Sequence, residues 1–416
     1  MIHKKRREEL LSKLGDDAVV IVSTNSEQKR NSDVNFPFRP DSSFWYLTGF
    51  IEPDAIAVFS KNNYSIFLRP KDKTQEIWNG VRLGVDLAPE TLLVDHAYDI
   101  GTFTDEIKIL INKESSLYFD KPTSDGWKNR ASTNILNKTI ASIFESSIHP
   151  LNPSLSEMRL IKDATEVKNM QTAANLASKA HMKAMVRTQP GLYEYNIAAE
   201  FDSIFKNENS DHSYPPIVAG GENACILHYN ENNKLLNDGD LLLIDAGCEI
   251  LGYASDITRT FPVNGKFSNA QKAIYEIVLD AQIQAIASIM PGEDVNKPHE
   301  IACEIIARGL MKLGIMNDIS NLREFYMHGT GHWLGLDVHD VGTKQIDSSF
   351  RKFKVGMVTT VEPGIYIRKD DKIDSKYWNI GIRIEDDVLV TIDGNHILSE
   401  AAIKNVDDIE HLMSQS

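Results

Sequence analysis

Two aspartates in one apolar stretch give this sequence its clearest hint of chemistry. Residues 241–263 (LLLIDAGCEILGYASDITRTFPV) contain two strand-like runs joined by a predicted turn at Ile250-Leu251-Gly252, with Asp245 before the turn and Asp256 after it. If the runs pair as a hairpin, the carboxylates lie roughly opposite each other, about 5 Å apart, where like charges destabilise the pairing. An ordinary explanation for the two aspartates would be that one belongs to the turn and the other caps it. Asp245 follows four aliphatic residues, however, and a buried charge persists only if it is paired or bound to a metal. We therefore expect metal ligands.

A histidine-rich segment downstream offers nitrogen ligands. Residues 326–340 (YMHGTGHWLGLDVHD) contain His328, His332 and His339. Two glycines lie between the first two histidines, and each costs about 1 kcal/mol inside a helix, so we predict strand or loop rather than the helical zinc motif. Residues 328 and 332 then share one face. Any one of these histidines alone would more often be a hydrogen-bonded core residue.

Two further segments supply glutamates at predicted strand positions. Glu362 ends an apolar strand immediately before a Pro-Gly turn, and Arg383 and Glu385 alternate onto one face of a strand in GIRIEDDVLV (381–390). Taken singly, these are explained as well by surface residues at strand ends or by a structural ion pair.

Taken together, four carboxylates and one imidazole are too many ligands for one divalent ion and suit two. Oxygen-rich ligation with a single histidine favours hard or borderline ions such as Mn²⁺. Two ions about 3.5 to 4 Å apart activate water and polarise a carbonyl, which predicts a hydrolase.

The composition limits the partners and the compartment. The chain has 416 residues, which suggests two domains, and a formal charge of -15, which argues against nucleic acid or an anionic membrane as the main partner. Its three cysteines are an odd number without close spacing, so we expect no disulfide framework and a reducing, cytoplasmic setting. The N-terminus does not resemble a secretory signal, although a basic amphipathic presequence is an alternative.

The pattern of apolar runs predicts an α/β protein of two parts. Residues 1–157 alternate short strands with helices, and the polar run around Pro150 and Pro153 is a plausible linker. The predicted strands are 18–23, 55–60, 65–69 and 116–119, and the predicted helices are 98–112 and 127–146.

Residues 158–416 repeat a unit of two long helices followed by strands. The predicted helices are 164–187 and 193–208, before strands reaching 261, and 269–290 and 297–313, before strands reaching 398. Ser268 can cap the third helix, and Pro291-Gly292 can stop it. We expect two similar α/β halves with the site in the seam between them.

The ordered set Asp245, Asp256, His332, Glu362, Glu385 resembles the ligand set of the pita-bread metallopeptidases, which include methionine aminopeptidases, prolidases and aminopeptidase P. Four segments resemble bacterial aminopeptidase P, namely residues 41–55, 76–86, 221–232 and 332–340. The resemblance implies a C-terminal pita-bread domain (158–416) behind a smaller N-terminal domain of the aminopeptidase P type (1–157).

The resemblance also implies a role for each ligand. Asp245 would hold one metal ion, His332 and Glu362 would hold the other, and Asp256 and Glu385 would bridge the two. The resemblance implies that both ions are Mn²⁺ and that Co²⁺ can substitute for them.

Further positions match the family's substrate side. His228 and His339 would bind the peptide and stabilise the tetrahedral intermediate, and His328, Tyr366 and Arg383 match other active-site positions. Trp78 matches a tryptophan that walls the pocket, in some cases that of a neighbouring subunit of a dimer or tetramer. Thr330 departs from the pattern, because relatives often carry an apolar residue there.

The implied activity is that of an Xaa-Pro aminopeptidase, in which a metal-bridging hydroxide releases the first residue of a peptide Xaa-Pro-Yaa. Its nearest rival is prolidase, which applies the same chemistry to Xaa-Pro dipeptides. A non-enzymatic pita-bread binding protein is a third class, disfavoured by the complete ligand set.

Overall fold

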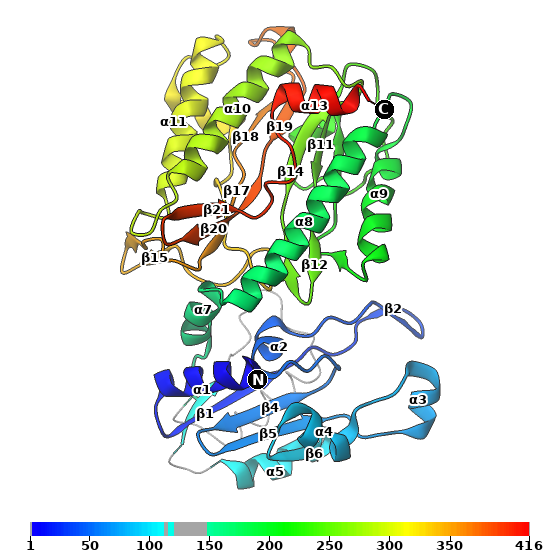
Figure 1. The fold of residues 1–416 in the computed structure, drawn as a ribbon, viewed down its shortest axis with the longest axis vertical. Coiled ribbons are helices and arrows are strands. Elements are labelled where there is room, and N and C mark those ends of the chain that lie inside the picture. Colours follow the sequence, from blue (N-terminus) through cyan, green and yellow to red (C-terminus); the bar gives the residue numbers. More distant parts are fainter. Residues whose placement is uncertain (1, 112–114, 120–147, 416) are drawn as a thin grey trace. The chain divides into compact units, whose positions relative to one another are not determined.

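The computed structural model describes residues 2–111, 115–119 and 148–415, so the predicted helix 127–146 lies outside the described residues. The chain divides into two compact units, Met1–Met158 and Arg159–Ser416 (Figure 1). None of the described helices is long and apolar enough to cross a membrane.

The first unit is built on a mixed sheet with the strand order β6-β5-β4-β1-β7-β8. The strands are β1 (Ala18–Ser23), β4 (Ile56–Ser60), β5 (Asn63–Leu68), β6 (His96–Asp99), β7 (Ser116–Phe119) and β8 (Ile148–His149). Strand β1 runs antiparallel to β4 and parallel to β7, and its buried Val19 and Ile21 share a core with Phe103 and Ile107 of α5 (Phe103–Leu110).

Helices and a small hairpin complete this unit. They are α1 (Ile2–Leu14), the hairpin β2 (Lys29–Asn31) and β3 (Val34–Asn35), α2 (Ser42–Thr48), α3 (Lys73–Asn79), α4 (Gly84–Leu92) and the 3-10 turn η1 (Ile100–Thr102). The predictions for strands 18–23 and 116–119 are confirmed. The helix predicted from residue 98 begins only at Phe103, because residues 96–99 extend the sheet as β6.

The segment predicted as a linker around Pro150 and Pro153 contains a helix that was not predicted. Residues 152–160 form helix α7 (Asn152–Leu160), and Pro153 lies in its first turn, where a missing N–H breaks no helical hydrogen bond. The boundary between the two units, Met158/Arg159, falls inside this helix.

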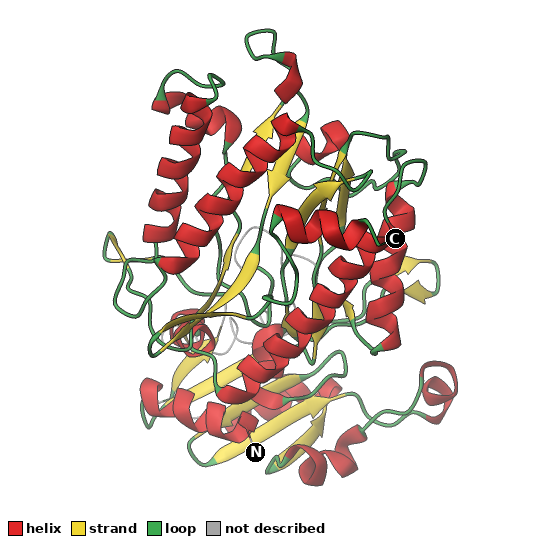
Figure 2. Cartoon of the chain, turned by 45° about the horizontal axis from the view of Figure 1, so that its top comes forward, coloured by secondary structure: helices red, strands yellow, loops and turns green. Residues whose placement is uncertain are grey.

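The four long helices predicted for the second unit are all present. They are α8 (Ala164–Arg187), α9 (Glu194–Asn207), α10 (Asn269–Ala287) and α11 (Lys297–Lys312). Ser268 caps α10 as predicted, in a reciprocal capping box with Gln271. That helix ends at Ala287, three residues before the predicted end. Helices α8 and α9 pack together, as do α10 and α11, and helices lie outside the strands (Figures 1 and 2).

Eight of the described strands of this unit form two three-stranded sheets and a hairpin. One sheet contains β10 (Ile217–Gly220), β11 (Leu241–Asp245) and β14 (Thr258–Pro262); the other contains β17 (Val358–Val361), β20 (Asp386–Thr391) and β21 (Gly394–Ile397); the hairpin is β18 (Gly364–Ile367) and β19 (Ile380–Arg383). Strand β19 contacts β11 and β14, so it joins the two halves, and α10 packs on β17, β18 and β19.

Short elements lie around this core. They are β9 (Asp211–His212), η2 (Gly221–Cys225), β12 (Cys248–Ile250), β13 (Tyr253–Ala254), η3 (Ile319–Asn321), α12 (Leu322–Phe325), β15 (Gln345–Ile346), β16 (Ser349–Phe350), η4 (Ser375–Tyr377) and α13 (Val406–Met413). The three cysteines form no disulfide.

The predicted hairpin of residues 241–263 is interrupted, and its aspartates are not opposite each other. Asp245 pairs with Thr258 in the β11–β14 ladder, and Asp256 lies in the irregular stretch before β14. Between β11 and β12, the Ser255 carbonyl approaches Gly247 so closely that a Cβ there would overlap it. The predicted turn is present further out, between β12 and β13.

The strand predicted to carry both Arg383 and Glu385 is also divided. Arg383 ends β19, which pairs with β18, and Glu385 stands just before β20, which pairs with β17. The break moves the chain from the hairpin to the other sheet, and both side chains stay buried.

Candidate metal centre

The second unit contains a cavity where the ends of its strands meet. The cavity has a volume of about 710 Å³. Nine of the eleven residues predicted for the site line it: Asp245 and Asp256, His328, His332 and His339, Glu362 and Glu385, His228, and Arg383. They come from the end of β11, the stretch before β14, the loop after α12, the end of β17, the β19–β20 junction and the loop after η2. The fold thus gathers residues more than 150 positions apart in the sequence.

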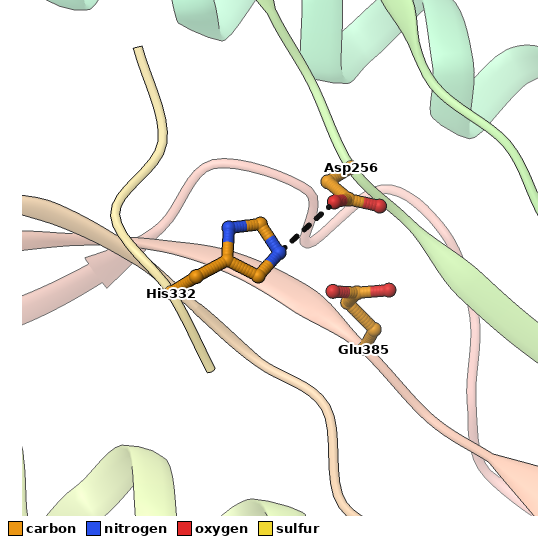
Figure 3. A group of neighbouring side chains, drawn as sticks. All are labelled: Asp256, His332 and Glu385. Atoms are coloured by element: carbon orange, nitrogen blue, oxygen red, sulfur yellow. Dashed lines mark ion pairs between the residues drawn. The ribbon is translucent and has the colours of Figure 1, made fainter. Parts of the chain in front are cut away.

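Three of these side chains form the closest group. One potential ligand atom each from Asp256, His332 and Glu385 lies within 4.8 Å of the other two, and the side chains point toward one another (Figure 3). His332 Nε2 is 3.3 Å from Asp256 Oδ2. His332 Nδ1 is 3.1 Å from the carbonyl oxygen of Trp333, which can only accept, so Nδ1 carries a proton and Nε2 is directed at the carboxylates. This is the usual arrangement of a histidine that ligates a metal.

The two remaining predicted ligands border this group. Glu362 Oε1 lies 3.7 Å from His332 Nε2. The hydroxyl of Tyr214 joins Asp245 to Asp256, with 2.6 Å to Oδ1 of each, and Arg383 donates to Asp245 Oδ2 at 2.6 Å. All four carboxylates therefore share one cavity with His332.

The cavity is strongly anionic, and the protonation equilibria reflect this. Burial raises the pKa of Glu362 to about 7, and burial together with repulsion from Asp256 raises that of Glu385 well above its usual range. Burial also raises the pKa of Asp245. The pKa of Asp256 is lowered instead, because the hydrogen bond and the charge of His332 outweigh its burial.

His332 responds to the same field. Burial alone would lower its pKa, but the hydrogen bond with Asp256 and the charge of Glu362 raise it to about 9. Among the described residues that line the cavity, five are acids and Arg383 is the one arginine or lysine, so negative charge is in excess. Oxygen donors in excess and a histidine with Nε2 directed at them fit hard or borderline divalent ions.

The loop before His332 is fixed by the contacts of Gly331 and Thr330. A Cβ at Gly331 would overlap the Thr360 carbonyl, so only glycine allows this approach. The hydroxyl of Thr330 is 2.6 Å from the Tyr326 hydroxyl and 2.9 Å from His299 Nδ1, and Thr330 is buried. The residue that departs from the family pattern thus makes polar contacts that an apolar residue could not make.

A chain of hydrogen bonds runs along one wall. Arg383 donates to the Tyr366 hydroxyl at 3.0 Å, and that hydroxyl is 2.8 Å from His328 Nε2. His328 Nδ1 is 2.7 Å from the carbonyl oxygen of Gly329. Tyr366 is buried and does not line the cavity itself, so it connects to it through His328 and Arg383. Burial raises the pKa of Tyr366 to about 12 and, with the charge of Arg383, lowers that of His328 to about 4.

The two histidines predicted to bind substrate are exposed in the cavity, whereas Trp78 does not line it. His228 and His339 line the cavity and are exposed, and the rings of His339 and His332 meet edge to face at 4.2 Å. Trp78 belongs to the first unit, on α3, which has no buried residue, and it is 79% exposed.

Three further residues, which the sequence did not predict, contact the predicted ligands. Tyr214 joins two aspartates, Thr258 donates to Glu385 at 2.7 Å, and Asp387 accepts from the backbone N–H of Asp256 at 3.2 Å. Asp256, Thr258 and Thr260 alternate along the chain, and this pattern could have predicted that Thr258 faces the same side as Asp256. Tyr214 precedes Pro215-Pro216 and has no local pattern, so only the fold brings it to the site.

Comparison with known proteins agrees with this geometry. Residues 168–392 match the profile of metallopeptidase family M24, and residues 3–118 match that of the aminopeptidase P N-terminal domain. The chain belongs to metallopeptidase family M24. As an M24 chain it is a metal-dependent hydrolase with the pita-bread fold, and its matched range contains all five predicted ligands.

Full-length relatives extend the comparison. The M24 chain is 45% identical to an Xaa-Pro aminopeptidase of Haemophilus influenzae, over 99% of this chain and 96% of the relative. It is 40% identical to one of Escherichia coli, over 99% and 97%. The solved proline aminopeptidase P II of Yersinia pestis is 39% identical, with a TM-score of 0.94 over 100% of this chain and 99% of that one.

Proposed function

We propose that this protein is an Xaa-Pro aminopeptidase, which releases the N-terminal residue from peptides with proline in second position. The observation that carries the proposal is the cavity in which four carboxylates surround His332, in a chain whose full-length relatives are named for this activity. Peptides are the substrates of an aminopeptidase, and penultimate proline is the specificity proposed here.

We propose that the site holds two divalent ions. Asp245 would ligate one, His332 and Glu362 would ligate the other, and Asp256 and Glu385 would bridge them. Bound ions would supply an ionised water as the nucleophile and polarise the scissile carbonyl. Mn²⁺ is the proposed native ion because the donors are oxygen and one imidazole, and Co²⁺ can substitute. One aminopeptidase P of E. coli has been solved in a zinc-substituted form with product.

The chain's own groups would handle the proton and the peptide. Glu362, which lines the cavity beside His332, would carry a proton to the leaving proline nitrogen. His228 and His339, exposed on the cavity wall, would bind the peptide and stabilise the tetrahedral intermediate. Arg383 would orient Asp245, and the hydrogen bonds of Tyr366 and His328 would keep Arg383 in place.

We also propose a cytoplasmic homo-oligomer, either dimer or tetramer. Three unpaired cysteines suit a reducing compartment. Around α3, Ile77, Trp78 and Val81 are 81%, 79% and 83% exposed, and such neighbouring apolar side chains favour contact with a second copy, where Trp78 would wall a pocket. A smaller species for Trp78→Ala in light scattering supports this contact, and an unchanged mass contradicts it.

The prolidase alternative differs in one recognisable respect. A dipeptidase must bind the free carboxylate just beyond proline, whereas an aminopeptidase leaves that side open and gains binding from further residues. A binding protein without metal would gain nothing from an anionic cavity with an oriented histidine, so these features disfavour that alternative.

Substrate length separates these functions. The experiment measures kcat/KM of the Mn²⁺-reconstituted protein for a matched dipeptide, tripeptide and pentapeptide that share Xaa-Pro, with alanine-for-proline peptides as controls. We expect the tripeptide and pentapeptide to be cleaved with higher kcat/KM than the dipeptide, and the alanine peptides hardly at all. A preferred dipeptide and an inert tripeptide would make the protein a prolidase, and no hydrolysis would favour the binding protein.

A further inference from the structure

A buried glutamate outside the metal centre organises the loop that carries His228. Glu194 is the first residue of α9 and is 0% exposed. Its Oε1 accepts from the Gly220 N–H at 2.8 Å and from Asn223 Nδ2 at 2.9 Å. Its Oε2 accepts from the Tyr229 hydroxyl at 2.8 Å and from the Lys234 N–H at 2.9 Å. Four donors thus converge on one carboxylate.

All four donors belong to a single segment, residues 220–234. The segment starts where β10 ends, and the only helix in it is the 3-10 helix η2. Leu227, His228 and Asn230 line the cavity. In the chain they lie between Asn223 and Lys234, two of the residues that contact Glu194. The Asn232 side chain also bonds Val218 and Pro216, and Arg368 donates to the Cys225 carbonyl, so Glu194 supplies four of the several polar contacts that fix the loop.

The contacts require an acceptor at both oxygens of Glu194. Each oxygen accepts from two neutral donors in the described residues. The place of Glu194 in the first turn of α9 adds the favourable field of the helix N-terminus.

We infer that Glu194 is a positioning residue for the peptidase, which places His228 on the cavity wall by fixing residues 220–234 from beneath. The inference rests on the proposed function only for the role of His228; the tethering of the loop stands on the contacts themselves. Glu194 touches neither the predicted ligands nor the substrate space, so it acts through the loop.

Glutamine is an informative replacement because it has the same shape and the wrong polarity. In one orientation its NH₂ faces the Gly220 N–H, and in the other it faces the Lys234 N–H. The Asn223 amide and the Tyr229 hydroxyl can turn to accept, but a backbone N–H cannot. Either way one backbone donor loses its acceptor, so Glu194→Gln must loosen one end of the loop.

The test compares Glu194→Gln with Glu166→Gln. Glu166 is likewise a buried glutamate at a helix start, and it accepts from the Tyr253 hydroxyl at 2.9 Å and the Asp163 N–H at 2.9 Å. Hydrogen–deuterium exchange should accelerate in residues 220–234 of Glu194→Gln and stay as in wild type there in Glu166→Gln. For an Xaa-Pro-Yaa peptide, kcat/KM should fall about 10- to 100-fold in Glu194→Gln, with bound metal unchanged, and stay within about twofold in Glu166→Gln.

A double variant shows whether the effect passes through His228. Glu194→Gln should divide its loss between kcat and KM as His228→Ala does, and it should add little to the loss in the His228→Ala background. A full additional loss there, or unchanged exchange of residues 220–234, overturns the inference. If Glu194→Gln does not fold, Tyr229→Phe, which removes one donor and leaves the charge, must give the same exchange pattern more weakly. If the wild type cleaves no Xaa-Pro-Yaa peptide, the proposed function fails, and the exchange comparison alone still decides the tethering.

Discussion

Two acidic residues adjacent in the sequence, Glu385 and Asp386, have opposite environments. Both are buried, at 2% and 0% exposed. Glu385 faces the cavity, where burial and repulsion from Asp256 raise its pKa well above the usual range. Asp386 faces the other way, where Arg259 Nη2 lies 2.7 Å from Oδ1 and Lys404 Nζ lies 2.6 Å from Oδ2. Those two cations outweigh its burial and hold its pKa well below the usual range.

The comparison separates an acid kept for stability from acids kept for binding. Ser399 and Gln282 also donate to Asp386, at 2.7 Å each, so its charge is satisfied within the protein. Glu385 has the Thr258 hydroxyl at 2.7 Å, while its nearest charged neighbours include further acids. A cavity that keeps such repulsion in the folded protein is suited to cations from outside.

Removing the metal should have the largest effect on activity, and it should act through the acids of the cavity rather than through Asp386. We expect exhaustive chelation to reduce hydrolysis at least about 1000-fold and Mn²⁺ to restore it, because the buried acids have no other source of sufficient positive charge. Activity and elemental analysis are measured on the same samples. Full turnover by protein shown to contain no metal would falsify the metallopeptidase mechanism.

Asp386→Asn should have the largest effect on stability. It leaves Arg259 and Lys404 buried with their partner neutralised, which costs about 3–5 kcal/mol of unfolding free energy. Denaturant unfolding of the chelated variant and the chelated wild type measures this cost without any contribution from metal. An unchanged midpoint would mean that the Asp386 side of the comparison is not a stabilising ion pair.

Glu385→Gln should act in the opposite sense. The variant should bind less metal, yet its metal-free form should be more stable than the metal-free wild type by about 1 kcal/mol or more, because a charge disfavoured by burial and by other acids is removed. Thr258 can still donate to the amide oxygen. The measurements are metal content and melting in chelator; a lower melting temperature of the chelated variant would contradict the repulsion argued for the cavity.

The pH dependence should show the same contrast as a smaller effect. The folded pKa of Glu362, about 7, lies above its ordinary 4.5, so its contribution to stability is complete below pH 4.5 and is lost as pH rises to about 7. His332, raised from 6.5 to about 9, loses its contribution between those values. Asp386 has a lowered pKa, so its contribution is present above its ordinary 3.8 and is lost on acidification.

We therefore expect the metal-free protein to lose stability from pH 4.5 to 9, and the lower part of this slope to disappear in Glu362→Gln. Melting temperatures in chelator across this range are the measurement, with the metal-loaded protein as the comparison. A metal-free wild type that becomes steadily more stable over the range would show that the cavity carries no excess of negative charge.

Local patterns predicted elements well and their junctions poorly. The helix 164–187 and the cap at Ser268 follow from periodicity and from a polar residue at the helix start, both of which are local properties. The hairpin register was wrong because the close approach of Gly247 to the Ser255 carbonyl interrupts it. The single strand through Arg383 and Glu385 was wrong because β19 pairs with β18, whereas β20 pairs with β17. Pro153 gave no sign of helix α7, because proline suits a first helical turn as well as a linker.

The sequence by itself determined the types and the order of the predicted ligands, because burying an aspartate after four aliphatic residues, or a glutamate at the end of an apolar strand, is unfavourable without a partner. It also determined that the charges would need a cation. Only the tertiary structure decided which acid faces which way, as Glu385 and Asp386 show. It also decided that Tyr214 contacts Asp245 and that Glu194 holds the loop of His228. The physical reason is that burial can be read along one strand, whereas a hydrogen bond between residues that are far apart in the chain depends on where the fold brings them together.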